Sequence, residues 1–452
     1  MLTRKTVTAV TAALSVAAGA GTAEAGPPGK WTQVTGLGQD DLNIMRVGLA
    51  RTGNGVLHVL WTRRDAGNAA SVLHSAVSSN AKSVTGPSTV FAAPDGVNES
   101  VDVVRAPDGS LRAFFAATNV FDSVMASATS ADGGSWTVQG PVSKLEPQGK
   151  PVYAASGIGA AVGTDGTFYS IWGDSAPGGG GFHVGVDPNA PDGELPGGLK
   201  ADPDIGVDSQ SGQVFAGWNS LDDEGVVVMP LNPGGARASI PTSAPQLQHR
   251  VGITGRIGAP GVFVAYARGS NPFLADPAVF RTDTGATTRL TSKDGELVSI
   301  AAASAGRLWV FWKDVGTIYA TRSNKAATRW GRIVRVKAPR GSTTIYNLSG
   351  EGSLGPLDLL ALMDPPTGTL SSWHQRILPG LFFTTKKSKG NTVVKVTDAG
   401  APVGGVTVKV KGDGSKKSGA GGTVSFDLPA GRYRVRADKA GYASYSKRVR
   451  VR

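Results

Sequence analysis

The sequence predicts an all-β protein, and three observations support this fold class. Short segments of alternating apolar residues run along the chain, and charged residues make up only 18% of its 452 positions. Glycine and proline, with 63 and 27 copies, mark turns between these segments. One type of segment recurs along most of the chain. This pattern excludes a long-helix protein, and the absence of cysteine excludes a disulfide scaffold and thiolate chemistry.

Residues 1–25 have the composition of a secretory signal peptide. Arg4 and Lys5 precede an apolar run of small residues, and residues 23–25 read Ala-Glu-Ala, a cleavage signature. No later stretch reaches the roughly 18 uninterrupted apolar residues of a membrane-spanning helix. We therefore expect a secreted protein with no membrane span.

A five-residue apolar segment recurs about every fifty residues and mostly ends in an aromatic side chain. The copies are residues 57–61, 111–115, 168–172, 214–218, 262–266, 308–312 and, most weakly, 357–361. A tight turn joins each copy to a preceding strand-like segment, and a longer loop leads to the next one. An antiparallel unit repeated at this period predicts a β-propeller over residues 26–380. We expect seven blades, with six as the alternative because the last copy is weak.

The N-terminal end of the mature chain is expected to close this ring. Tryptophan opens the predicted outer strand of two blades, at Trp136 and Trp330, and residues 31–34 also begin with a tryptophan before any blade has started. The seventh repeat stops after its third predicted strand, near residues 373–378. We therefore predict that residues 31–34 supply the outer strand of the seventh blade and remove an exposed sheet edge.

Residues 130–136, Ser-Ala-Asp-Gly-Gly-Ser-Trp, resemble the Asp box of sialidase-like β-propellers, one residue short. The segment falls between the third and fourth predicted strands of its blade, where that motif belongs. In the family the motif is a fold-stabilising turn away from the active site, so the resemblance implies a fold and not an activity. The arginine motif that a sialidase carries early in its chain is missing, and residues 376–379 match it poorly at the wrong end.

Residues 392–452 resemble the carboxypeptidase-regulatory-like domain, a small transthyretin-like β-sandwich. The resemblance rests on spaced apolar, glycine and aromatic positions, among them Val396, Asp398, Pro402, Gly405, Phe426, Leu428, Gly431, Tyr433 and Tyr442. It implies a non-catalytic spacer or adhesive module. The lysine-rich residues 381–391 are predicted to form a linker before it, or its first edge.

The positive charge lies almost wholly in this C-terminal part. Residues 381–452 contain 16 Lys and Arg against 4 Asp, which equals the net charge of +12 of the whole chain. Alternation along predicted strands places the basic residues on one face and residues such as Val435 on the other. The candidates for binding an anionic polymer are Lys409, Lys411, Arg432, Arg434, Arg436, Arg448 and Arg450. The alternative is a solvated face that only keeps the sandwich soluble.

Acidic residues are the remaining candidates for a site on the propeller, since no G-x-S-x-G or H-E-x-x-H motif occurs and the five histidines are isolated. Every predicted loop between a second and a third strand carries aspartate, and together these loops form one mouth of the ring. The mouth candidates are Asp65, Asp122, Asp174, Asp222, Asp223, Asp276, Asp314 and Asp364. Such acids can hold sugar hydroxyls, a cationic ligand or Ca²⁺. Aspartate is also a common turn residue, which is the alternative explanation, and no metal site or other cofactor is predicted.

These observations favour a secreted, non-catalytic binding protein. Its propeller mouth would recognise a glycan or an extracellular protein, while the basic module holds it on a cell-wall polymer at the cell surface. The alternatives are a sialidase-like glycoside hydrolase or lyase, which needs only two suitably separated carboxylates, and a purely structural envelope component. No catalytic residue is assigned, and whether the protein is an enzyme stays open. We expect a monomer without a nucleic-acid partner, because no aromatic stacking platform interleaves with the basic residues.

Overall fold

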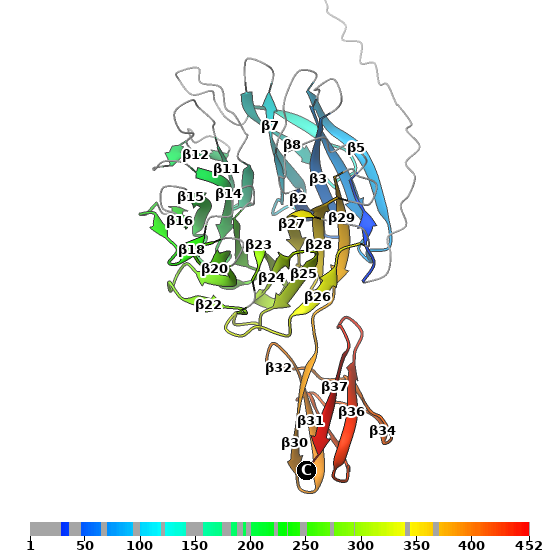
Figure 1. Cartoon of the computed structure of the whole chain (residues 1–452). Coiled ribbons are helices and arrows are strands. Elements are labelled where there is room, and N and C mark those ends of the chain that lie inside the picture. Colours follow the sequence, from blue (N-terminus) through cyan, green and yellow to red (C-terminus); the bar gives the residue numbers. More distant parts are fainter. Residues whose placement is uncertain are drawn as a thin grey trace, which may run out of the picture.

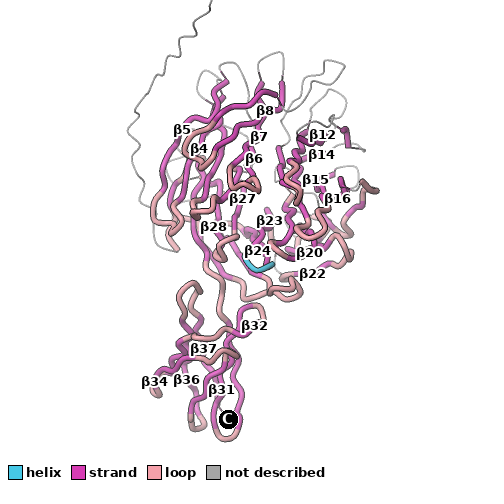
Figure 2. The backbone as a smooth tube through the Cα atoms, turned by 180° about the vertical axis from the view of Figure 1, so that it is seen from behind, coloured by secondary structure: helices cyan, strands magenta, loops and turns pink. Residues whose placement is uncertain are grey.

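The computed structural model describes residues 29–35, 47–64, 70–93, 100–118, 123–141, 157–173, 182–187, 193–195, 200–220, 225–232, 234–244, 251–271, 275–292, 294–339, 344–364 and 370–451. Within these ranges the chain is almost entirely β-strand (Figure 1), and the one helical element is the short 3₁₀ turn η1 (Ser304–Gly306) (Figure 2). The all-β prediction is confirmed. In the described part of the chain no helix is long and apolar enough to cross a membrane.

Seven antiparallel sheets follow one another along residues 32–377. The first three are β2 (Gly48–Arg51), β3 (Leu57–Arg64), β4 (Ala70–Val77) and β5 (Val84–Ala93); β6 (Val101–Arg105), β7 (Leu111–Thr118), β8 (Ser123–Ser130) and β9 (Thr137–Pro141); and β10 (Ile158–Val162), β11 (Phe168–Gly173), β12 (Phe182–Asp187) and β13 (Gly193–Leu195). The fourth and fifth are β14 (Lys200–Val207), β15 (Val214–Ser220), β16 (Gly225–Asn232) and β17 (Ala238–Ser239); and β18 (Ser243–Ala244), β19 (Gly252–Arg256), β20 (Ala259–Arg268), β21 (Asp276–Arg281) and β22 (Thr287–Arg289). The sixth and seventh are β23 (Glu296–Ala303), β24 (Arg307–Asp314), β25 (Thr317–Arg322) and β26 (Val334–Lys337); and β27 (Ile345–Glu351), β28 (Leu357–Met363) and β29 (Ser371–Ile377), joined by β1 (Thr32–Gln33).

The repeated apolar segment forms the second strand of every sheet. Its last residue is buried in each copy, at no more than 1% exposure: Trp61, Phe115, Trp172, Trp218, Tyr266, Trp312 and Ala361. Apolar clusters built on these strands span neighbouring sheets, as where Trp61 packs with Leu360 of the seventh sheet. Burying such large side chains between sheets is what holds successive units side by side. The weak seventh copy, in which aliphatic residues replace the aromatic ones, also forms a fully buried strand, β28.

The sheets form a closed ring, which is the arrangement of a β-propeller (Figure 1). One strand of each sheet contacts its counterpart in the next sheet, in the order β2, β6, β10, β14, β19, β23 and β27, and β27 of the seventh sheet contacts β2 of the first. Strand β1 pairs with β29, with Thr32 opposite His374 and Gln33 opposite Trp373. The prediction that residues 31–34 complete the seventh sheet is therefore confirmed. The sixth sheet differs in one detail, since its outer strand begins at Val334 and not at Trp330, which makes only an isolated bridge with Ser323.

Two further sheets share an apolar core at the C-terminus, and we call this part of the chain the sandwich. One contains β30 (Phe382–Ser388), β31 (Asn391–Asp398), β32 (Ala401–Pro402) and β35 (Thr423–Phe426), and the other contains β34 (Gly414–Lys417), β33 (Thr407–Val410), β36 (Gly431–Asp438) and β37 (Tyr445–Val451). Residues 381–391 are therefore not a linker: seven of them form β30, which pairs with β31 along its length. The physical reason is that Leu381 and Phe383 enter the sandwich core, so the lysines lie on a strand and not in a loop.

The sandwich is attached to the ring beside the sixth and seventh sheets. Asp398, at the end of β31, forms an ion pair with Arg322 of β25 and lies 3.5 Å from Arg307 of β24. The Arg332 guanidinium stacks on the Tyr445 ring at 5.0 Å. Because Arg307 begins β24, the sandwich lies at the opposite end of that strand from Asp314, one of the predicted mouth residues.

Candidate functional site

Three of the eight mouth aspartates belong to the described residues, and the other five, Asp65, Asp122, Asp174, Asp222 and Asp223, lie outside them. Asp276 forms an ion pair with Arg289 of the neighbouring strand, at 2.6 Å. Asp364 accepts a hydrogen bond from the Tyr346 hydroxyl at 3.0 Å, and this bond raises the pKa of Tyr346. Each of these two carboxylates is therefore already bound to a side chain on a neighbouring strand of its own sheet.

Asp314 is the last residue of β24, and a tight turn follows it instead of a long loop. It pairs with Thr317 across a two-residue turn in which Val315 has a φ of 51°. This is the geometry of a tight hairpin, where aspartate is common for conformational reasons. The expectation of a long loop after the second strand is therefore wrong for the sixth sheet. Among the described residues, no three histidine, aspartate or glutamate side chains gather as a metal-binding group.

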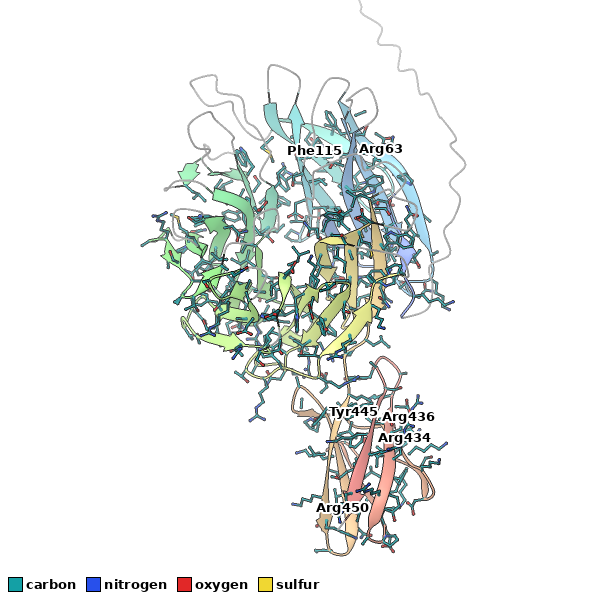
Figure 3. The ribbon with its side chains drawn as sticks, in the orientation of Figure 1. Arg63, Phe115, Arg434, Arg436, Tyr445 and Arg450 are labelled. Atoms are coloured by element: carbon teal, nitrogen blue, oxygen red, sulfur yellow. The ribbon has the colours of Figure 1, made fainter. Side chains whose placement is uncertain are left out.

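The basic residues of the sandwich form one exposed surface, as alternation along the strands predicts. Cross-strand pairing places Arg432 opposite Arg450 and Arg434 opposite Arg448, while Lys409 lies opposite Arg436. All seven candidates are exposed, whereas Val435, Val449 and Val451 between them are buried. Figure 3 shows Arg434, Arg436 and Arg450 on β36 and β37. We call Lys409, Lys411, Arg432, Arg434, Arg436, Arg448 and Arg450 the basic face.

Like charges directly opposite each other destabilise a strand pair, so the basic face carries an electrostatic penalty in the free protein. One acid relieves part of it: Asp438 accepts from Arg436 Nε at 2.8 Å, and this contact lowers the pKa of Asp438. Arg434 Nε donates to the Ser446 hydroxyl at 3.1 Å. The two opposed arginine pairs, in contrast, present four guanidinium groups with planar donor geometry suited to carboxylate or phosphate.

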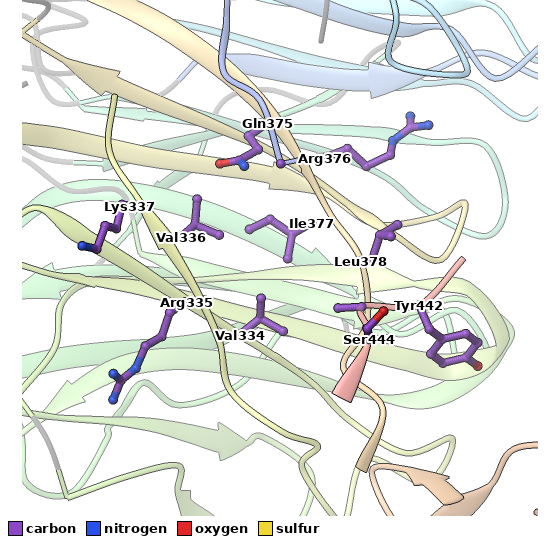
Figure 4. Close-up of a pocket in the computed structure, with 12 residues that line it drawn as sticks. Val334, Arg335, Val336, Lys337, Gln375, Arg376, Ile377, Leu378, Tyr442 and Ser444 are labelled. Atoms are coloured by element: carbon purple, nitrogen blue, oxygen red, sulfur yellow. The ribbon is translucent and has the colours of Figure 1, made fainter. Parts of the chain in front are cut away.

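A second basic surface, which the sequence analysis missed, lies where the sandwich meets the ring. A groove of about 530 Å³ lies here. The ring lines it with residues 334–337 of β26, residues 375–378 at the end of β29, and Gly29, and the sandwich lines it with residues 442–444. Figure 4 shows Arg335 and Lys337 on one side and Tyr442 and Ser444 on the other. We call it the junction groove. Alternation in residues 334–337 reveals that Arg335 and Lys337 are exposed, but no local pattern reveals what they face across the groove.

The turn at residues 130–136 packs the second sheet against the first. Ser130 Oγ accepts from the Gly133 amide at 2.8 Å, and Asp132 Oδ1 accepts from the Gly134 amide at 2.7 Å. Gly133 has a φ of 82° and lies so close to the His58 ring that a Cβ would fall 2.0 Å from it. His58 in turn contacts His74 at 3.0 Å, and burial lowers the pKa of both histidines to about 4. This cluster serves the packing of the two sheets.

A buried ion-pair cluster joins the first and seventh sheets. Asp358 of β28 pairs with Arg51 of β2 and accepts from His374 Nε2 and Arg376 Nε, each at 2.8 Å. Burial opposes ionisation of Asp358, but the hydrogen bonds from His374 and Arg376 and the charge of Arg51 hold its pKa well below its usual range. A carboxylate so fully occupied by cations is a structural anchor and not a proton donor for catalysis.

Comparisons with known proteins give neither a family nor a curated relative. No family model matches the chain, and no curated protein matches it. Several solved structures resemble the chain at low sequence identity. A protein of unknown function from Dyadobacter fermentans has 10% identity and a TM-score of 0.47, and the match covers 78% of this chain and 97% of that one. A six-bladed β-propeller lectin from Aleuria aurantia has 13% identity and a TM-score of 0.40, covering 74% and 93%. The Hadza microbial sialidase has 12% identity and a TM-score of 0.43, and the match covers 74% of this chain and 65% of that protein. At these scores the comparisons assign no activity to the chain.

Proposed function

We propose that the protein is a secreted, non-catalytic binding protein that the basic face holds on an anionic polymer of the cell envelope. The observation that carries this proposal is the pairing of Arg432 with Arg450 and of Arg434 with Arg448. A surface that serves only to keep a protein soluble can mix acidic with basic residues, whereas the basic face places arginines directly opposite each other on neighbouring strands. A bound polyanion would neutralise both pairs at once.

The rest of the architecture is consistent with this role. We propose that the seven sheets are the seven blades of the propeller, that residues 130–136 are a shortened Asp box, and that the C-terminal sandwich is a carboxypeptidase-regulatory-like module. The sandwich contacts Arg307 at the start of β24, while Asp314 lies at its end, so a polymer held by the sandwich leaves the propeller mouth facing away. The mouth is then free to recognise a glycan or an extracellular protein.

Binding of the full-length protein to purified cell envelopes, measured against salt concentration, tests the proposal. The variant with Arg432, Arg434 and Arg448 replaced by serine should bind roughly threefold to a hundredfold more weakly, since exposed ion pairs contribute about 0.2–1 kcal/mol each. The matched control replaces three exposed lysines by serine: Lys386 and Lys395 on the other sheet of the sandwich, and Lys389 in the turn that joins its strands β30 and β31. Equal loss of binding in both variants would show that net charge, and not the basic face, is responsible.

The hydrolase or lyase alternative is tested on the same preparations. The wild-type protein is incubated with sialosides, aryl glycosides and uronic-acid polymers, and reducing ends and unsaturated products are followed. We expect no turnover. Turnover that one mouth substitution, such as Asp364→Asn, abolishes would replace the binding function by an enzymatic one.

A further inference from the structure

The junction groove continues the basic face onto the propeller. Ser444 lines the groove, and its hydroxyl is reached from the basic face by Arg436 Nη2 at 3.4 Å. Ser444 is exposed and directly precedes β37, on which Ser446, Arg448 and Arg450 form one exposed row. Across the groove, Arg335 and Lys337 are both exposed and lie on one side of β26, with the buried Val336 between them.

The groove has a mixed lining, unlike the basic face. Its charges come from Arg335 and Lys337, because Arg376 is already paired with Asp358. Leu378 and Tyr442 add half-buried apolar and aromatic surface, and the Ser444 hydroxyl at the groove donates to Asp438. Cations beside apolar walls match a sugar acid, which carries a carboxylate on a ring with apolar faces. Asp438, whose carboxylate accepts from Ser444, is neutralised by its ion pair with Arg436.

The two surfaces are held in a fixed relation by the contacts between sandwich and ring. Asp398 is 1% exposed and pairs with Arg322, and the Ala443 amide donates to the Pro379 carbonyl at 2.9 Å. The Arg332 side chain also reaches the Ser444 carbonyl at 3.4 Å, beside the groove. A ligand that crosses the junction therefore meets a preorganised path and not two independently moving domains.

We infer that the junction groove binds one segment of a linear carboxylated polysaccharide whose next segment lies on the basic face, so that one chain contacts both domains. This inference rests on the proposed function and adds to it the class of polymer and a second subsite. Arg335 and Lys337 bind carboxylates of the segment in the groove, while Leu378 and Tyr442 contact its sugar rings. Because the two subsites are joined through one ligand, a long chain gains affinity that a short one does not.

The test measures binding of the full-length protein to an oligogalacturonate of about twelve residues and to a trimer, a length contrast that reports linked subsites. The double variant Arg335→Ser/Lys337→Ser should lose roughly tenfold in affinity for the long probe, and its ratio of long-probe to trimer affinity should fall. The control Lys82→Ser/Arg105→Ser removes two exposed charges, in the turn before β5 and at the end of β6, and should leave both affinities unchanged. Fully methyl-esterified oligogalacturonate of equal length should not bind.

Hydrogen exchange on the wild-type protein locates the subsite without any substitution. The long probe should slow exchange in residues 334–337 and 442–444 together, in addition to β36 and β37. Slowed exchange in β36 and β37 alone, with an unchanged Arg335→Ser/Lys337→Ser variant, would overturn the groove subsite and leave the proposed function standing. Failure of the basic-face variant to weaken binding would overturn the proposed function itself, and equal binding of the esterified probe would overturn the carboxylate class.

Discussion

Asp398 of the sandwich and Arg322 of the sixth sheet form a buried ion pair across the junction between the two parts of the chain. Asp398 is 1% exposed and Arg322 is 7% exposed, and Arg307 lies 3.5 Å from the same carboxylate. Arg322 Nη1 also donates to the Gly355 carbonyl at 3.1 Å, which ties the pair to the seventh sheet. The sandwich is therefore anchored by charge as well as by the chain connection.

Asp398→Asn should destabilise the junction by about 3 kcal/mol or more, because it leaves two buried guanidinium groups without their counter-charge. Thermal unfolding followed by tryptophan fluorescence, together with limited proteolysis between the two parts, measures the effect. Asp413→Asn, at an exposed turn of the same sandwich, is the matched control and should leave the midpoint unchanged. An Asp398→Asn protein as stable and as protease-resistant as the control would contradict a role of this pair in anchoring the sandwich.

Sequence patterns predicted the strands well because their signals are local. The period of two sorted Arg432, Arg434 and Arg436 from Val435, and the recurring segment identified the buried second strand of each sheet. The closing strand was predictable because the seventh repeat lacked a fourth strand, and the segment that begins with Trp31 belonged to no other repeat. These inferences need only spacing along the chain.

The junction could not be predicted in the same way. Arg322 and Asp398 are 76 residues apart, and neither differs in its local sequence from an ordinary exposed charge. The junction groove likewise depends on Arg335 and Ser444 meeting from different domains. The lysine pattern of residues 386–390 suggested a linker, since composition does not show that Phe383 enters a core. The mouth remains a prediction, with five of its eight acids outside the described residues.

The buried cluster around Asp358 should make closure of the ring sensitive to one substitution. Asp358→Asn removes the carboxylate that Arg51 and Arg376 share; Arg51 keeps its ion pair with Glu351, whereas Arg376 loses its acid, and we expect a loss of about 3–5 kcal/mol in the free energy of unfolding. Urea unfolding measures this loss. Asp294→Asn, at an exposed position, serves as the control. Because the pKa of Asp358 is depressed, its contribution is present at neutral pH and is lost only as the pH falls below the ordinary aspartate value of 3.8.

The pair His58 and His74 should give the protein a separate dependence on mildly acidic pH. Both pKa values are lowered by burial from 6.5 to about 4. Between these values the unfolded chain binds protons that the folded chain does not, so stability should be full above pH 6.5 and fall as the pH drops toward 4. Urea midpoints across this range measure the slope. His74→Gln should reduce the dependence of the urea midpoint on pH, and His58→Gln/His74→Gln should nearly remove it. If the double variant loses stability toward pH 4 as steeply as the wild type, other groups cause the dependence.

The N-terminal strand should determine whether the ring stays closed. The Val34 amide donates to Ser372 O at 2.9 Å and its carbonyl accepts from Ser75 Oγ at 3.1 Å, so this segment joins the seventh sheet to the first. Trp31 Nε1 adds a bond to the Lys337 carbonyl at 2.8 Å. A chain that lacks residues 26–35 loses these contacts and exposes the edge of β29, so we expect a loss of roughly 3 kcal/mol or more and concentration-dependent aggregation. A chain that lacks only residues 26–28 keeps β1 and is the control. Size-exclusion chromatography and thermal unfolding compare the two proteins. If the chain that lacks residues 26–35 stays monomeric and unfolds at the same temperature as the control, β29 does not need its partner strand.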